Sequence, residues 1–90
     1  MKIDIIVPSY NEEDNVINFY NKVNETLGDI KHNFIFVDDG SKDKTLKRLK
    51  ELHEKDDECV KIISFSKNFG KEAAIYAGLL HSSSDYACII

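Results

Sequence analysis

Three short polar segments of the sequence each follow an apolar run, and the first of them contains Pro8, Tyr10 and Glu12. Pro8 lacks a backbone N–H and therefore favours the end of a strand, whereas the ring and hydroxyl group of Tyr10 suit contact with a planar base. Asn11 is a typical N-cap residue, and its simplest role is to begin a helix. For Tyr10 and Glu12, a ligand-binding role and a purely structural role are both open.

The second segment contains two adjacent carboxylates, Asp38 and Asp39, followed by Gly40. Neighbouring carboxylates repel each other unless one of them faces solvent, a helix N-terminus or a ligand. Because side chains alternate along a strand, we expect one carboxylate to cap the next helix and the other to accept hydrogen bonds from a nucleobase or a ribose. The alternative is a local turn, in which an aspartate side chain accepts a backbone N–H and Gly40 adopts a positive φ.

The third segment runs from Lys67 through Asn68 and Gly70 to Lys71 and directly precedes a predicted helix. Backbone N–H groups at the start of a helix and the ammonium groups of lysines both suit contact with a phosphate. A lysine on a loop is usually only solvated, so this segment indicates a phosphate site only in combination with the other two. The three histidines lie between separate elements, and their spacing is not that of metal ligands.

The elements that must position these segments are indicated by four apolar runs separated by helical patterns. The runs predict strands at residues 3–7, 34–37, 60–65 and 86–90. The first three runs are largely apolar, which is typical of strands covered on both faces in a mostly parallel sheet. We therefore expect the α/β class, as a three-layer α/β/α, Rossmann-like arrangement of about four mainly parallel strands and three helices. The carboxyl ends of parallel strands meet at one edge, so the three polar segments should converge there.

Three helices are predicted between these runs. In the first, apolar residues recur at helical spacing up to Gly28, and we expect it to begin at Asn11 with three acidic residues, from Glu12 to Asp14, in its first turn. The second carries three leucines flanked by pairs of opposite charge at i, i+4, which indicates a solvated face. The third covers about residues 71–80, and its small side chains permit close approach to a sheet.

Length and composition limit the function classes. The chain has 90 residues with 42% hydrophobic and 31% charged content, which is enough for one small core and too little for two domains. A net charge of -4, from 12 basic and 16 acidic side chains, lacks the basic character of a nucleic-acid-binding protein, so no nucleic acid is expected as a partner. The two cysteines, Cys59 and Cys88, form no zinc or disulfide pattern, which fits a reducing cytoplasm.

Three motifs occur in a specific order and cover essentially the whole chain. They are Ile-Ile-Val-Pro-Ser-Tyr-Asn-Glu from residue 5, Phe-Val-Asp-Asp-Gly-Ser-Lys-Asp-Lys-Thr from residue 36, and Ser-Lys-Asn-Phe-Gly-Lys-Glu-Ala-Ala from residue 66, followed by Ala77 and Gly78. Together they resemble family 2 glycosyltransferases of the GT-A fold. The similarity is greatest to the branch of dolichol-phosphate mannosyltransferases and bacterial polyprenyl-phosphate glucosyltransferases, and three linked motifs are much more specific than any one.

This resemblance implies transfer of a sugar, with inversion, from a nucleoside-diphosphate sugar to an acceptor such as a polyprenyl phosphate or a cell-surface glycan. A UDP-sugar is preferred as the donor, with a GDP-sugar next. Residues 1–90 would be the N-terminal nucleotide-sugar-binding part of the catalytic domain. Asp39 would accept a hydrogen bond from the base, with Asp38 as support. The base and ribose pocket would be lined by Pro8, Tyr10 and Glu12, and the base and diphosphate would lie close to Asn68, Gly70 and Lys71.

The resemblance also implies a metal site that this sequence lacks. Members of the family carry an Asp-x-Asp motif after the fourth strand, whose carboxylates hold Mg2+ or Mn2+ on the donor diphosphate. The sequence stops at Ile90, before that position. The catalytic residues are likewise expected beyond Ile90, so we expect this chain to hold no metal by itself and to be inactive unaided. The parent enzyme is expected in the cytoplasm, at the cytoplasmic face of the membrane, in cell-envelope glycan biosynthesis.

Three other classes of protein compete with this interpretation. A dinucleotide-binding oxidoreductase needs G-x-G-x-x-G after the first strand, and no glycine occurs between Pro8 and Asp14. A phosphoacceptor signalling domain needs its acid pair after the first strand, where only Glu12 and Glu13 stand. A non-catalytic nucleotide-binding or interaction domain stays open as an alternative, because an exposed sheet edge at residues 86–90 could pair with a second copy of the chain.

Overall fold

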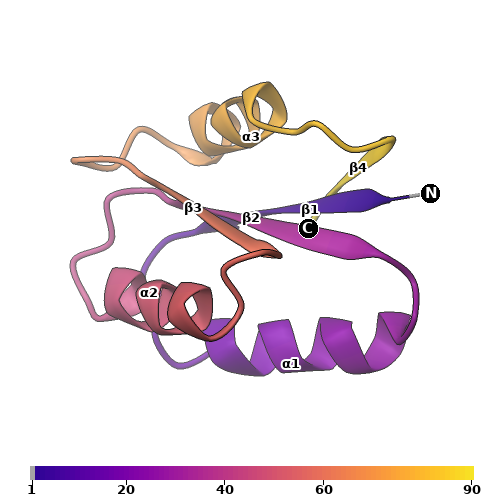
Figure 1. Ribbon diagram of the computed structural model, residues 1–90. Coiled ribbons are helices and arrows are strands. Elements are labelled where there is room, and N and C mark those ends of the chain that lie inside the picture. Colours follow the sequence, from indigo (N-terminus) through magenta and orange to yellow (C-terminus); the bar gives the residue numbers. More distant parts are fainter. Residues whose placement is uncertain (1) are drawn as a thin grey trace.

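Strands and helices alternate along residues 2–90, the part of the chain that the computed structural model describes (Figure 1). The strands are β1 (Ile3–Ser9), β2 (His32–Asp38), β3 (Val60–Ser64) and β4 (Tyr86–Ile89), and the helices are α1 (Val16–Leu27), α2 (Thr45–Lys55) and α3 (Lys71–Leu80). All neighbouring strands pair in parallel, in the order β3-β2-β1-β4. Helices α1 and α2 cover one face of the sheet and α3 covers the other (Figure 1). The predicted three-layer α/β fold is confirmed.

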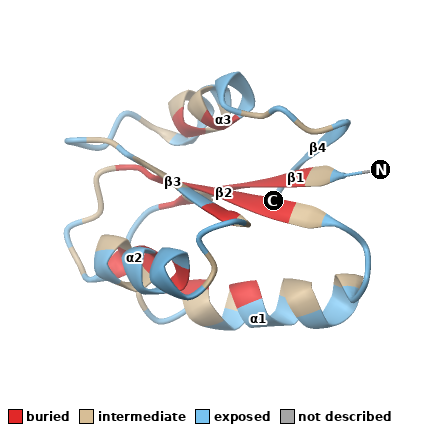
Figure 2. Cartoon of the chain, in the orientation of Figure 1, coloured by how far each residue is buried: buried red, intermediate tan, exposed pale blue. Residues whose placement is uncertain are grey.

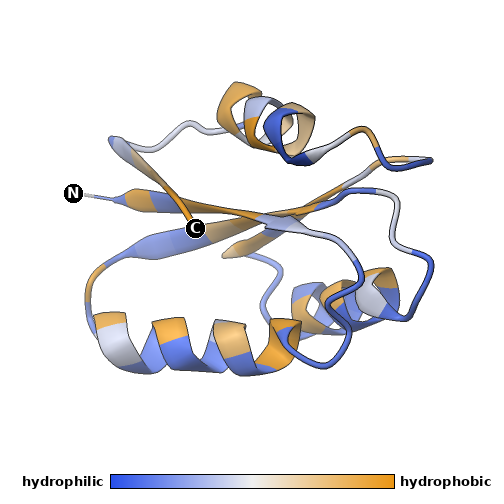
Figure 3. Ribbon diagram, turned by 180° about the vertical axis from the view of Figure 1, so that it is seen from behind, coloured by the Kyte–Doolittle hydropathy of each residue, from blue (hydrophilic) through white to orange (hydrophobic). Residues whose placement is uncertain are grey.

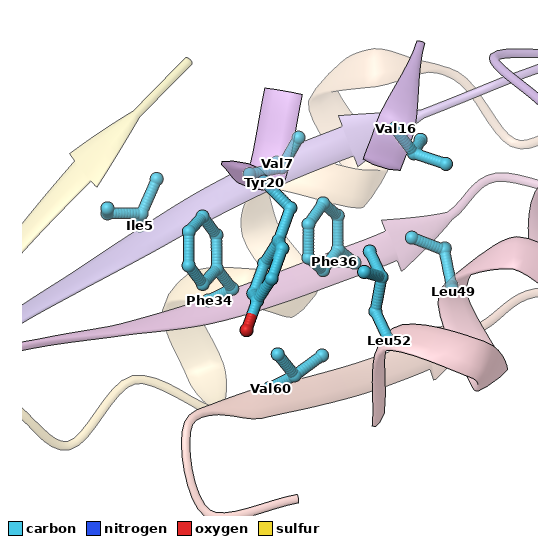
Figure 4. Close-up of a cluster of buried hydrophobic side chains, with 9 residues drawn as sticks. All are labelled: Ile5, Val7, Val16, Tyr20, Phe34, Phe36, Leu49, Leu52 and Val60. Carbon is cyan, nitrogen blue, oxygen red and sulfur yellow. The ribbon is translucent and has the colours of Figure 1, made fainter. Parts of the chain in front are cut away.

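The core has two parts because β1 and β2 are buried on both faces (Figure 2). On the side of α1 and α2, the rings of Phe34 and Phe36 stack with their centroids 5.4 Å apart, and the ring of Tyr20 lies 5.0 Å from that of Phe34 (Figure 4). On the side of α3, the buried cluster is smaller and consists of Ile6, Ile35, Val37 and Ala74. Burial on both faces explains why these two strands are largely apolar rather than alternating in sequence.

Helix α3 lies close to the sheet because its inner side carries small residues. A Cβ atom placed on Gly78 would lie 2.5 Å from Cγ2 of Ile6, so a larger residue has no room at this crossing. The close approach predicted for this helix is confirmed. In the view of Figure 3, α3 is mostly hydrophobic after its hydrophilic first residues, whereas the side of α1 that faces away from the sheet is hydrophilic.

Helix α1 begins later than the sequence predicts. It starts at Val16, with Asn15 at the N-cap position and no acidic residue in its first turn. The segment before it forms a turn, in which the N–H groups of Asn15 and Val16 donate to the carbonyl oxygen of Glu12. Asn11 is not the N-cap, because its backbone has a positive φ of 52° and its side chain is bonded to the loop after β2. The expectation of an N-cap at Asn11, with acidic residues in the first helical turn, was wrong; the predicted end of the helix at Gly28 is confirmed.

Strand β1 continues past Pro8, where the sequence predicts its end. Pro8 is in register with Val37 of β2, and the strand ends at Ser9. Peptide groups two residues apart point to the same side of a strand, and the carbonyl oxygen of Ile6 accepts the N–H of Ile90 on the β4 side. Pairing between β1 and β4 stops at Ile6, so the missing N–H of Pro8 faces a side without a partner strand among residues 2–90. Proline is therefore tolerated inside this strand.

At the amino end of β1, Asp4 holds the turn that precedes β4. Its carboxylate is 3% exposed and accepts the hydroxyl groups of Ser82 and Ser84, each at 2.7 Å, and the N–H groups of Ser83 and Ser84, at 3.0 and 3.1 Å. Burial alone would raise the pKa of Asp4, but these hydrogen bonds outweigh burial and hold the pKa well below its ordinary value. Asp4 therefore fixes the turn from which β4 starts.

Strand β4 forms an exposed edge of the sheet. Each of its residues is exposed to solvent (Figure 2). Two of them, Tyr86 and Ile89, have large hydrophobic side chains. The edge therefore has the apolar, accessible character that the sequence indicated.

Among the helices of residues 2–90, none combines the length and the apolar character needed to cross a membrane.

Candidate functional site

The carboxyl ends of β1 and β2, together with the start of α3, surround a cavity of about 250 Å3. It is lined by Pro8, Ser9, Tyr10, Glu12, Asp39, Lys71 and Ile90. Five of the residues predicted as site residues therefore meet at one edge of the sheet, as expected for segments that follow parallel strands. The other three predicted residues do not line the cavity, namely Asp38, Asn68 and Gly70. Ser9 and Ile90 line it without having been predicted.

The loop after β1 is held in place by the loop after β2. The N–H of Asn11 donates to Oγ of Ser41 at 2.9 Å, and Oδ1 of Asn11 accepts a backbone N–H of the same loop at 2.9 Å. The N–H of Glu12 donates to Oγ1 of Thr45 at 2.8 Å, and Thr45 is fully buried. These hydrogen bonds fix the backbone directly after Tyr10. Ser41 and Thr45 thus support the cavity without lining it.

Asp38 takes part in a local turn. Its side chain is 2% exposed, and Oδ1 accepts the N–H of Ser41 at 3.3 Å while Gly40 has a φ of 67°. The local-turn alternative is therefore confirmed for Asp38. Neither adjacent carboxylate caps α2, which corrects the expectation that one of them would: the N–H of the first residue of α2 is bonded instead to Oδ1 of Asp43, at 2.9 Å. Asp43 takes this place because it lies only two residues before the helix.

Asp39 connects the end of β2 to the loop that precedes α3. Its carboxylate is 4% exposed and accepts the N–H of Phe69 at 2.7 Å and the N–H of Gly70 at 3.1 Å. The side-chain Nδ2 of Asn68 donates to the same carboxylate at 3.3 Å. Asn68 and Gly70 therefore contact Asp39 and do not line the cavity. Asp39 contacts these two residues and also lines the cavity.

Gly40 brings the same two segments into direct backbone contact. Its positive φ is unfavourable for residues with a Cβ atom. A Cβ at this position would lie 2.6 Å from the carbonyl oxygen of Lys67, and still closer to the carbonyl carbon of Lys67 and to the backbone nitrogen of Asn68. Only glycine fits between β2 and this loop.

Lys71 is the lysine of the third segment that lines the cavity. It is the first residue of α3. The N-cap residue of this helix, Gly70, has no side chain that could accept the N–H groups of the first turn. The positive end of the helix and the ammonium group of Lys71 therefore belong to the same corner of the molecule. Lys67 is placed differently, because its Nζ lies 5.2 Å from the ring centroid of Phe69. One lysine and the helix start could contact a phosphate at the cavity.

The carboxylates of residues 2–90 do not converge on a metal site. Within this range, no group of three His, Cys, Asp or Glu side chains could hold an ion. The carboxylate of Asp39 is already bonded to N–H groups, and that of Asp38 belongs to its own turn. The residues present therefore do not fit Mg2+ or Mn2+, and the metal expected for the parent enzyme stays a prediction.

The parallel sheet and the cavity at the carboxyl ends of its strands define a Rossmann-like α/β protein, in which ligands bind at this end of the strands. Residues 4–90 match the family described as glycosyl transferase family 2, and the chain belongs to this family. The family resemblance of the three motifs is thereby confirmed.

Relatives and solved structures agree with this family. An uncharacterized glycosyltransferase of Synechocystis is 42% identical over 97% of this chain and 26% of its own length, and a bactoprenol glucosyl transferase of Shigella phage SfV is 42% identical over 94% of this chain and 28% of its own length. The chain thus spans about a quarter of these relatives. The crystal structure of S. aureus TarS 1-349 is similar to all of this chain, with a TM-score of 0.85 and 23% sequence identity, and the match spans 27% of the TarS chain. TarS has also been crystallised in complex with UDP. This likeness confirms the GT-A type of fold.

Proposed function

We propose that this chain is the nucleotide-binding part of a glycosyltransferase that uses a nucleoside-diphosphate sugar as its donor. The observation that carries the proposal is the cavity in which Tyr10, Glu12, Asp39 and Lys71 meet at the carboxyl ends of the strands. Family membership and the relatives named bactoprenol glucosyl transferase support a lipid-phosphate acceptor, with a cell-surface glycan as the alternative acceptor.

The residues that line the cavity offer chemistry for both parts of a nucleoside diphosphate. The end of β1 and the loop after it contribute Tyr10, which is 41% exposed and whose ring can lie against a base, together with Pro8 and Glu12. The start of α3 contributes the positive charge of Lys71, which suits the diphosphate. Uridine is the base that we propose, with guanosine next, and the expectation that Asp39 accepts a hydrogen bond from the base stays a prediction.

Transfer with inversion requires groups in addition to those of the cavity. The acceptor oxygen would attack the anomeric carbon from the face opposite the nucleoside diphosphate, whose bond to that carbon breaks as the new bond forms. A divalent ion, when bound to the diphosphate, neutralises the charge of the leaving group. We expect Mg2+ or Mn2+ to be held by carboxylates other than those of residues 2–90, and the parent enzyme to work at the cytoplasmic face of the membrane.

A calorimetric titration of the chain with UDP, GDP and NAD tests this function. We expect UDP to bind more tightly than GDP, and NAD not to bind, because the loop after β1 lacks the glycines that a dinucleotide requires. Addition of Mn2+ should change the dissociation constant for UDP by less than about threefold, since the carboxylates present do not form an ion site.

Matched tyrosine variants locate the binding in the same titration. Tyr10→Ala should weaken UDP binding about tenfold, because stacking of a base on an aromatic ring contributes about 1–3 kcal/mol. Tyr76→Ala serves as the control, because Tyr76 is an exposed tyrosine of α3 that does not line the cavity. Equal effects of the two substitutions, or binding of NAD as tight as that of UDP, would contradict the proposed site.

A second candidate function is that of a non-catalytic interaction domain that associates through β4. It is favoured by the apolar and exposed residues of this edge strand, which carries no lysine or proline to prevent pairing. Sedimentation of the chain over a range of concentrations should then show a dimer that Ile89→Lys abolishes. A monomer at every concentration would remove this candidate.

A further inference from the structure

The carboxylate of Asp39 has few acceptor positions left for a ligand. An ionised carboxylate offers about four acceptor positions on its two oxygens. In Asp39, Oδ1 accepts the N–H of Phe69 at 2.7 Å, and Oδ2 accepts the N–H of Gly70 at 3.1 Å and Nδ2 of Asn68 at 3.3 Å. The N–H of Gly70 also lies 3.3 Å from Oδ1. All of these donors belong to one segment, residues 68–70, so the carboxylate mainly binds the protein's own loop.

The loop from Phe65 to Gly70 is anchored at its start, because the N–H of Phe65 donates to the carbonyl oxygen of Asp38 at 2.9 Å and Phe65 packs against the core on the side of α3. Its end, residues 68–70, has little other support than Asp39: it contains no helix or strand, and Phe69 is more than half exposed. No atom lies within 4 Å of the position of a Cβ on Gly70. The aromatic contact of Phe69 is with Phe65 of the same loop. Apart from the close approach at Gly40, the hydrogen bonds to Asp39 are the contacts that hold residues 68–70 against β2.

The position of this loop determines where α3 begins. Gly70, whose N–H is bonded to Asp39, is the N-cap of α3, and Lys71 follows it directly and lines the cavity. The carboxylate also lies at the positive end of the helix, where a negative charge is favourable. Asp39, which directly follows β2, thus holds the N–H of the N-cap residue and fixes where the helix begins.

We infer that Asp39 supports nucleotide binding as a positioning residue: it clamps residues 68–70 and thereby sets Lys71 and the start of α3 at the cavity. This inference rests on the proposed function and differs from direct recognition of the base. A residue that reads the base changes the preference among bases when it is replaced. A residue that positions the diphosphate-binding end changes the affinity for all nucleoside diphosphates by the same factor.

The Asp39→Asn variant separates the two roles in titrations with UDP and CDP. The amide keeps one acceptor oxygen but places an NH2 group among N–H donors, so the clamp is weakened. We expect the affinities for UDP and CDP to fall together by about tenfold, with an unchanged ratio between them. A changed ratio, or an unchanged affinity for both nucleotides, would overturn the clamp. Asp57→Asn is the matched control, because Asp57 is exposed and lies in the turn after α2, and it should change neither affinity.

A second variant keeps the test decisive if Asp39→Asn does not fold. Asn68→Ala removes one donor from the Asp39 carboxylate and leaves that carboxylate charged and freer to meet a base. If Asp39 clamps the loop, Asn68→Ala should weaken the binding of both UDP and CDP by about threefold. If Asp39 instead recognises the base directly, Asn68→Ala should leave UDP binding equal or make it tighter. Equal or tighter binding would therefore overturn the inference.

Amide hydrogen exchange distinguishes failure of the inference from failure of the proposed function. In the nucleotide-free chain, the N–H groups of Phe69 and Gly70 should be protected, and Asp39→Asn should speed their exchange by at least about tenfold. Absence of nucleotide binding by the unmodified chain would refute the proposed function, while this exchange experiment would still show whether Asp39 holds the loop. Unchanged exchange at both positions in the variant would overturn the clamp itself.

Discussion

Replacement of Gly40 by alanine is expected to lower the free energy of unfolding by about 3 kcal/mol and to weaken UDP binding at least tenfold. The positive φ of 67° accounts for about 1–2 kcal/mol of this effect. The remainder arises because the new Cβ would lie 2.6 Å from the carbonyl oxygen of Lys67, so the backbone of the loop before α3 must move. This movement displaces the segment that carries Lys71, which is why binding should fall with stability.

Gly28 provides the matched control for this substitution. It also has a positive φ, of 53°, but no atom lies within 4 Å of its Cβ position. At φ 53° and ψ -117° the backbone of Gly28 is itself unfavourable for alanine, so Gly28→Ala should lower the stability through backbone strain alone and leave UDP binding unchanged. Urea denaturation followed by circular dichroism measures the stability of both variants, and calorimetric titration measures their UDP binding. A loss of UDP binding in Gly28→Ala equal to that in Gly40→Ala would show that the close contact between Gly40 and Lys67 does not position the site.

The second large effect is expected for Asp4→Asn, at the amino end of β1. The variant should lose about 3 kcal/mol of unfolding free energy at pH 7, because several partly buried donors then face a neutral amide with one acceptor oxygen. Both serine hydroxyl groups and the N–H groups of Ser83 and Ser84 now bond to the carboxylate. The turn before β4 should loosen with them. Asp57→Asn, an exposed change of the same kind, should have almost no effect.

The effect of Asp4 also has a defined pH dependence. The pKa of Asp4 is lower in the folded chain than its ordinary value of 3.8, so the folded state favours the charged form. The stability that this provides is fully present above about pH 5 and is lost as the pH falls below 4 toward the folded-state pKa. The difference in stability between the unmodified chain and Asp4→Asn should therefore be constant from pH 7 to 5 and shrink below pH 4. A difference that grows on acidification would contradict this role.

The layered fold follows from features that are local in the sequence. The apolar run of β2 is continuous because the strand is buried on both faces. Such runs alternate with helical patterns, and few arrangements other than a parallel sheet between helices are compatible with this combination. Gly78 likewise indicated close packing of α3 through the small size of the residue alone, and its contact with Ile6 bears this out.

The loops were harder to predict because contacts between loops determine them. Asn11 has the side chain of a good N-cap, yet a hydrogen bond to Lys42, far along the chain, holds it in another conformation. Strand alternation predicted different roles for Asp38 and Asp39, but the capping of α2 by one of them was wrong, because the partners depend on which loop lies beside each carboxylate. Such partners become visible only when the strands are paired.

The convergence of the site residues could be predicted, but the full lining of the cavity could not. Because ligands bind beyond the carboxyl ends of parallel strands, Tyr10, Glu12 and Asp39 were predicted to lie together, and all three line the cavity. Ser9 could have been found, because it stands between Pro8 and Tyr10 in the same segment. Ile90 carries no chemical signal, and its place at the cavity depends on the pairing of β4 with β1.

The central claim is that a nucleoside diphosphate binds at the carboxyl ends of the strands, and nuclear magnetic resonance of the 15N-labelled chain with UDP tests it most directly. The expected result is a set of shifted amide signals at the cavity, from Tyr10, Glu12, Asp39 and Lys71. A second, apolar cavity of about 260 Å3 shares Ile90 with this site, and the signals of its other lining residues, such as Val23, Leu27 and Cys88, should remain unperturbed. No shift on addition of UDP, or shifts confined to that second cavity, would contradict the proposed site.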